Sequence, residues 1–155
     1  MDLAPFRFIV VGSPAYFARH AGPDCPDDLS RHACLRLRRS SGALAPWSLD
    51  DDGHSIEVAV SGPFIANDFP TLLGAAVEGV GLAQVPEPIA GELVRTGKLV
   101  QVLERFAPMT PGMFLYHPGR RQMTPKLRAF IDHVRYRPDV PAAFQARSAG
   151  SGPDR

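Results

Sequence analysis

The stretch FIANDFPTLLGAAVEGVGLAQVPEP, residues 64–88, decides the fold of this chain. It predicts a short strand at 64–66, then a helix that Asn67 or Asp68 caps and Gly79 ends, and then a strand at 80–86. Strand and helix alternating through short links are typical of an α/β domain. The stretch contains no group able to do chemistry, so its function is not catalysis by its own side chains.

The same alternation continues on both sides of this stretch. Further strands are predicted at 7–11, 33–38, 98–103 and 113–118, a hairpin at 47–62, and helices at 13–22, 25–32, 87–97 and from Thr124 onward. Ser13 caps the first helix, Gly22 lies past its end, and residues 51–53 form the hairpin turn. We therefore expect a parallel or mixed sheet with helices packed on it.

Composition and charge narrow the class of protein. The chain has 155 residues, of which 45% are hydrophobic and 21% charged, with a net charge of +1. These values fit one soluble globular domain with no electrostatic attraction to nucleic acid or membranes. No apolar run reaches the ~18 residues of a membrane span, and the start shows no signal peptide. Two cysteines favour a reduced, cytoplasmic protein, and a single disulfide in a periplasmic protein is the alternative.

The two ends of the sequence differ. Residues 137–155 are rich in Pro, Gly, Ser and Ala and are predicted to be disordered. At the N-terminus the strand-like pattern has already begun by Phe8. This pattern favours a domain whose beginning lies before this sequence.

No catalytic or metal-binding pattern stands out. The nearest metal set is His20, Cys25, His32 and Cys34, but its spacing matches no paired zinc template. The segment GSPAY at Ser13 fails the G-x-S-x-G pattern of hydrolases. The segment GAAVEGVG lacks the Lys and hydroxyl of a phosphate loop, so its glycines are better explained as a helix end and as close packing. We expect no enzyme activity, no cofactor and no metal.

What remains is a pair of strand ends that lead into helix N-termini, at Ser13 and at residues 66–68. Free backbone N–H groups at such points suit a small anionic or polar ligand. In open α/β sheets, ligands bind outside the carboxyl ends of the strands.

The order of the motifs resembles a known family. The series is RFIVVGSPAYFARHAGPDCPDDLSRHACLRL, a Trp with a strand pair, FIANDFPTLLGAAVEGVGLAQVP, LVRTGKLVQVLERF and FLYHPGRRQMTPKLRAFIDHV. Together these pieces resemble the effector-binding (substrate-binding) domain of LysR-type transcriptional regulators, over about residues 5–136. The resemblance implies a fold like a type 2 periplasmic binding protein, with two α/β subdomains and a small-molecule effector in the cleft between them.

The resemblance also implies a domain plan. Residues 1–136 would be a partial effector-binding domain, with the second subdomain at 13–106 and a return strand and C-terminal helix of the first subdomain at 107–136. The winged helix-turn-helix, the linker helix and the first half of the first subdomain are not matched. DNA would be contacted only through that N-terminal domain. The family pairs in dimers, and helix 70–78 would lie near the dimer surface.

The effector-facing residues carried over from the family are Phe64, Ile65, Ala66 and Asn67, with Ser13 as a weaker candidate. The apolar residues among them hint at an aromatic or hydrophobic acid as effector. Two alternatives remain open: a periplasmic solute-binding protein of the same fold, and a small enzyme using Cys25 or Cys34 with a histidine.

Overall fold

The structure is a computed structural model that describes residues 5–110, 125–126 and 129. The chain forms two compact units, one of Met1–Phe6 with Thr110–Arg155 and one of Arg7–Met109. The second unit holds most of the described residues. The predicted strand at 113–118, most of the helix from Thr124 and the tail at 137–155 lie outside the described residues. Within the described part, no helix is long and apolar enough to cross a membrane.

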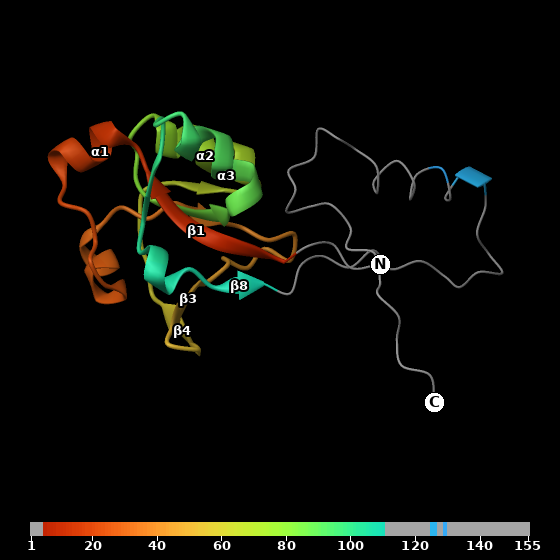
Figure 1. Cartoon of the computed structure of the whole chain (residues 1–155), viewed down its shortest axis with the longest axis horizontal. Helices are drawn as coiled ribbons and strands as arrows, with labels where there is room; N and C mark the ends of the chain where they lie inside the picture. The colour runs from red at the N-terminus through yellow and green to blue at the C-terminus, as the bar shows by residue number, and fades with distance from the viewer. Residues whose placement is uncertain (1–4, 111–124, 127–128, 130–155) are drawn as a thin grey trace. The chain divides into compact units, whose positions relative to one another are not determined.

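Helices and strands alternate along the described chain (Figure 1). In order they are β1 (Phe6–Gly12), α1 (Pro14–Arg19), the 3₁₀ helix η1 (Pro26–Arg31), β2 (Arg36–Leu37), β3 (Trp47–Asp51), β4 (His54–Val58), β5 (Ile65–Ala66), α2 (Phe69–Val77), β6 (Ala83–Pro86), α3 (Glu87–Arg95), β7 (Val100–Val102), the 3₁₀ helix η2 (Glu104–Phe106) and β8 (Met109–Thr110).

A mixed sheet forms the middle of the second unit. β1 pairs antiparallel with β6 on one side and with β7 on the other, and β8 also pairs with β1. β2 and β5 run parallel to each other. A parallel bridge between Cys34 and Leu82 joins the two groups, with hydrogen bonds Leu35 N–Leu82 O of 2.7 Å and Leu82 N–Ala33 O of 2.8 Å. The strands therefore lie in the order β5, β2, β6, β1, β7, and the expected mixed sheet is confirmed.

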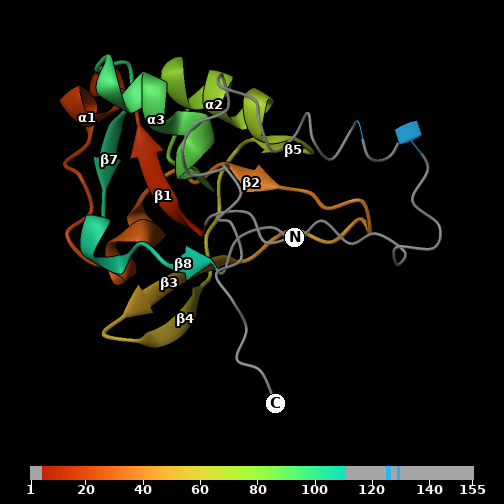
Figure 2. The same cartoon turned by 45° about the vertical axis from the view of Figure 1, so that its right-hand side comes forward.

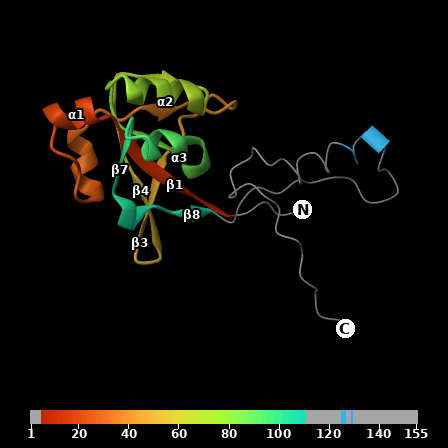
Figure 3. The ribbon, with the colours of Figure 1, turned by 45° about the horizontal axis from the view of Figure 1, so that its top comes forward.

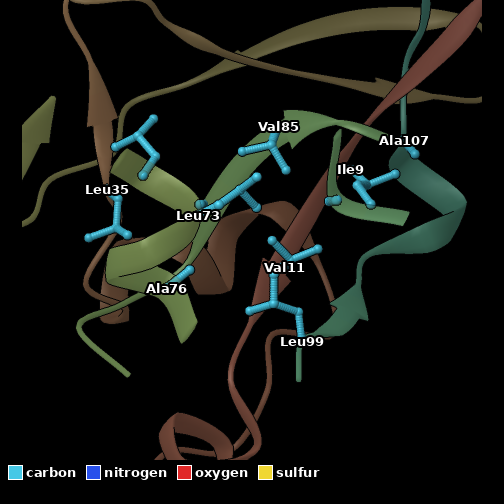
Figure 4. Close-up of a cluster of buried hydrophobic side chains, with 11 residues drawn as sticks. Ile9, Val11, Leu35, Leu73, Ala76, Val85, Leu99 and Ala107 are labelled. Carbon is cyan, nitrogen blue, oxygen red and sulfur yellow. The ribbon is translucent and has the colours of Figure 1, made fainter. Parts of the chain in front are cut away.

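α2 and α3 cover one face of this sheet (Figures 1 and 3). Leu73 and Ala76 of α2 meet Val85 of β6 and Val11 of β1 in a buried cluster (Figure 4). Burying each leucine or valine of this cluster contributes about 1.5–3 kcal/mol to folding. This cluster fixes α2 on the sheet and thereby fixes the direction of its N-terminus.

The opposite face is covered by α1, η1 and the β3–β4 hairpin (Figure 2). Val10 of β1 packs there with Tyr16, Leu29 and Trp47, while its neighbours Ile9 and Val11 pack under the helices. A strand that is buried on both faces reads as a continuous apolar run, which explains the composition of residues 8–11. Gln84 Nε2 donates to Ser48 O at 2.7 Å and ties the hairpin to β6.

Most of the predicted ends of helices and strands are confirmed, and a few differ. Ser13 caps α1, Asp68 caps α2, and the two positive-φ residues Asp52 and Gly53 turn the hairpin. Gly22 lies past the end of the first helix, as predicted, but the helix already ends at Arg19, because His20 is extended (φ −135°). Of the strand expected at 33–38, only Arg36–Leu37 forms a regular strand. Cys34 and Arg38 on either side form isolated β-bridges.

Candidate functional site

The carboxyl ends of three parallel segments lie at one edge of the sheet, and Figure 2 shows two of them, β2 and β5, side by side. Leu37 of β2 lies opposite Ala66 of β5, and the parallel bridge from Cys34 to Leu82 sets Leu37 level with Val85 of β6. At this edge lie the residues that come directly after the three segments, which include Asn67, Pro86 and the residues after β2. Such an edge is where open α/β sheets bind ligands.

The antiparallel strand β1 contributes its beginning to the same edge. Phe8 lies opposite Pro86 in the register with β6. The ring of Phe8 is 6.2 Å from the ring of Phe69, the first residue of α2. The edge is thus bounded by an aromatic pair beside the N-terminus of α2.

The four residues expected to face the effector fall into two pairs. Phe64 and Ala66 are partly buried and pack against the core under α2. Ile65 is 42% exposed, and Asn67 is exposed. Because successive side chains of a strand point to opposite faces, Ile65 is more open to solvent than Phe64 and Ala66.

Asp68 settles which residue caps α2. Its Oδ1 accepts from Thr71 N at 2.7 Å, and its Oδ2 accepts from Thr71 Oγ1 at 2.9 Å. The Asn67 side chain is therefore not used as the cap. α3 begins directly after Pro86 at the same edge, with no side-chain cap. Its first turn also holds Pro88, which has no N–H, and the carboxylate of Glu87, so few free donors stand at this end of the helix.

Sequence reasoning missed Arg38 at this edge. Its backbone N donates to Ala66 O at 2.7 Å, which places it beside Asn67. Its side chain is exposed, and Nη1 donates to Gly42 O at 2.9 Å. In the sequence Arg38 is one of three arginines in the run RLRR, residues 36–39, and only the pairing of β2 with β5 brings it to the edge.

Ser13 lies at the other end of the sheet. It follows Gly12, whose partner is Val100, whereas Phe8 at the ligand edge is five residues earlier in the same strand. At ~3.3 Å per residue the separation is roughly 16 Å. Ser13 is 2% exposed, and its Oγ accepts from Tyr16 N at 3.1 Å to cap α1. The structure does not bring Ser13 together with Asn67.

Among the described residues, the buried Cys34 and the nearby histidines show no nucleophile–base pair. Cys34 is buried, and this burial raises the pKa of its thiol to about 12. His32 Nδ1 lies 2.8 Å from Tyr16 Oη. Burial, and then the nearby His20, lower the pKa of His32. Within the described ranges no three His, Cys, Asp or Glu residues gather as a metal site.

Residues 1–138 match the LysR substrate binding domain family. The chain belongs to this family. A putative transcriptional regulator of Pseudomonas aeruginosa is 39% identical over 133 residues, which cover 85% of this chain and 44% of that protein. PgrR of Escherichia coli K12, an HTH-type transcriptional regulator, is 33% identical over 83% of this chain and 43% of its own length.

Solved structures place the LysR substrate-binding domain in the same fold. The full-length virulence activator AphB of Vibrio cholerae, of the LTTR family, superposes with a TM-score of 0.67 at 26% identity, over 85% of this chain and 45% of AphB. The regulatory domain of AphB C227S from Vibrio vulnificus gives 0.69 at 24% identity, over 86% and 66%. The expected α/β fold of the periplasmic-binding-protein type is confirmed.

The chain spans less than half the length of the first curated relatives that it matches. A shorter relative, the putative LysR family substrate binding domain-containing protein YagP of Escherichia coli K12, is 35% identical over 67% of this chain and 77% of its own length. The proteins described here are named as regulators or as LysR domains. They lend no support to the periplasmic solute-binding alternative.

Proposed function

We propose that this chain is the effector-sensing and self-associating part of a LysR-type transcriptional regulator. The observation that carries the proposal is the ligand edge formed by β2, β5 and β6 in a domain of the LysR substrate-binding family. Residues 13–106 correspond in this proposal to one subdomain, and residues 107–136 return to the other. DNA would be contacted by a part of the regulator outside the matched residues, as the relatives' HTH-type names suggest.

The effector would contact Ile65, Asn67 and Arg38. Phe64 and Ala66 would support this surface by packing against the core behind it. Arg38 supplies a cation at this edge, so a small organic acid fits it, provided that it binds away from Glu87 at the start of α3. Ser13 has no part in it, because its Oγ is used as a cap at the far end of the sheet. With no activated nucleophile, we propose binding without catalysis.

Ligand-induced stabilisation of the full chain tests the effector proposal. In a thermal-shift screen of organic acids, a ligand at one hundred times its Kd adds about 2.7 kcal/mol, or roughly 5–10 °C for a chain of this size. Asn67→Ala and Arg38→Ala should reduce the shift. Ser55→Ala, an exposed polar change on β4, is the control and should not. A shift that survives both edge variants would place the effector elsewhere and contradict the proposal.

Self-association is proposed through the outer face of α2. Glu78 is the only charged residue among residues 69–80, whereas α3 carries Glu87, Glu92 and Arg95. Interface cores are depleted in charge, so α2 is the better contact face.

Two matched glycine substitutions test this face. Gly74 of α2 and Gly91 of α3 both have open space where a Cβ would stand. In sedimentation equilibrium, Gly74→Arg should shift the chain toward monomer, and Gly91→Arg should leave it unchanged. The reverse pattern would refute the role of α2.

A further inference from the structure

Tyr16 of α1 is a buried residue whose hydroxyl group makes two hydrogen bonds. Its Oη lies 2.8 Å from His32 Nδ1, and Ala33 N donates to the same Oη at 3.3 Å. Tyr16 is only 2% exposed, so water cannot readily replace either partner. The hydroxyl is satisfied both as donor and as acceptor when it accepts from Ala33 N and donates to His32. This arrangement requires that Nδ1 of His32 carries no proton.

Ala33 connects this hydroxyl group to the middle of the sheet. The carbonyl of Ala33 accepts from Leu82 N at 2.8 Å, beside the parallel bridge that joins β2 to β6. Leu35 N donates to Leu82 O at 2.7 Å at the same bridge. A displacement of the Tyr16 hydroxyl therefore acts directly on a residue that holds the two groups of strands together.

The groups around His32 oppose its protonation on balance. Burial, and then the nearby His20, lower the pKa of His32, and Arg31 acts in the same direction. Asp28 acts in the opposite direction. It stays ionised, because the N–H of Asp24 and the Arg31 side chain hold its pKa at about 2. The neutral form that the hydrogen bonds require is thus also the form that the surroundings favour.

The other titratable groups near this pair keep their charge around neutral pH. β4 also packs against η1, and its His54 and Glu57 do not contribute to the shift in the pKa of His32. Burial raises the pKa of Cys34 to about 12 and raises the pKa of Tyr16, so both keep their protons. Histidine is the side chain whose charge changes between about pH 5 and 8.

Protonation of His32 turns Nδ1 into a donor. Two donors, this Nδ1–H and the Ala33 N–H, then face Tyr16 Oη, and the hydroxyl hydrogen has no acceptor among the described residues. Because an unsatisfied buried hydroxyl costs free energy, a protonated His32 should move away from Tyr16.

We propose that the Tyr16–His32 pair is a pH-sensitive switch. It holds Ala33 in place at neutral pH, and it loosens the bridge between β2 and β6 in acid. The switch needs no ligand, so it is independent of the function proposed above. Since β2 and β6 both end at the proposed effector edge, a looser bridge would also change that edge.

Amide hydrogen exchange on the full chain, followed by NMR between about pH 7.5 and 5, tests this switch. After correction for the intrinsic pH dependence of exchange, protection of the Leu82 and Leu35 amides should fall roughly fivefold in acid, as expected when one buried hydrogen bond is lost. Below about 1 M urea this exchange should not depend on urea, because local opening exposes little surface.

Four variants assign the effect to the pair. His32→Asn keeps an acceptor near the position of Nδ1 but cannot titrate, so protection should stay high at both pH values. Tyr16→Phe removes the hydroxyl, so protection should already be low at neutral pH and should not change further. His20→Gln should retain the fall. His54→Gln is the matched control, because this exposed histidine lies on β4, and it should behave as the wild type.

Several results would overturn the proposal. No fall in the wild type would show that acid leaves the bridge intact. A fall that survives in His32→Asn, or one that disappears in His20→Gln, would place the titrating group elsewhere. A fall that depends on urea as steeply as global unfolding would show that acid destabilises the whole chain rather than this bridge.

Discussion

At Gly81 the structure makes a sharp quantitative prediction. A Cβ built at Gly81 would lie 2.4 Å from Ala33 O and 3.0 Å from the Ala33 carbonyl carbon. Ordinary Cβ contacts are 3.4 Å or longer. Both neighbours are backbone atoms, so no side chain can swing away. Gly81→Ala must push the segment before β2 away from the segment before β6 by about 1 Å.

That displacement acts on the bonds that join the two halves of the sheet. Leu82 N donates to Ala33 O at 2.8 Å, and Leu35 N donates to Leu82 O at 2.7 Å. Overpacking costs about 1–3 kcal/mol. Each weakened hydrogen bond adds up to about 1 kcal/mol. We expect Gly81→Ala to lower the free energy of unfolding by roughly 2–4 kcal/mol.

Gly91→Ala is the matched control, because the same methyl group has open space there in the middle of α3. An alanine in a helix interior is favoured over glycine by about 0.5–1 kcal/mol. In urea unfolding followed by circular dichroism, the midpoint should fall for Gly81→Ala by roughly 1–2 M and rise slightly for Gly91→Ala. Equal midpoints for the two variants would refute the close approach of these segments.

Three further outcomes follow from the described contacts. Asp68→Ala removes both bonds to Thr71 and should cost about 1 kcal/mol, read from the same urea curves. The pKa of His32 is lowered in the folded chain, so its stabilising contribution is present above its ordinary pKa of 6.5 and is lost as pH falls through the lower folded value; His32→Gln should flatten the stability profile in that window. Ellman's reagent should titrate the half-buried Cys25 quickly and the buried Cys34 only after denaturation; two fast thiols would contradict this.

Local signals predicted most of the secondary structure. The caps at Ser13 and Asp68, the helix end at Gly79 (φ +80°) and the turn at Asp52–Gly53 all depend on residues close in sequence. The resemblance to the LysR-type family could be stated from the sequence for the same reason. The motifs of that family are these same local signals in a fixed order. Elements that depend on distant partners were less predictable.

The glycines of GAAVEGVG show this difference. The sequence explained them together as a helix end and close packing. In the structure Gly79 ends α2, Gly81 packs against Ala33, and Gly74 has open space around it. The role of Gly81 depends on a segment almost fifty residues earlier, which no local pattern at 74–81 reveals.

The position of the proposed effector edge was predictable only in part for the same reason. The sequence shows that residues 64–67 and Ser13 each sit between a strand and a helix, and it offers Ser13 as the weaker of the two candidates. Which edge each point occupies depends on strand direction. β1 runs antiparallel to β6, so its carboxyl end lies at the edge where β6 begins. The same direction turns Ser13 into a buried cap and leaves Asn67 beside Arg38 at the other edge. A strand's direction is set by its partners, so two similar strand–helix junctions in one sequence can be ranked as ligand sites only after the sheet is assembled.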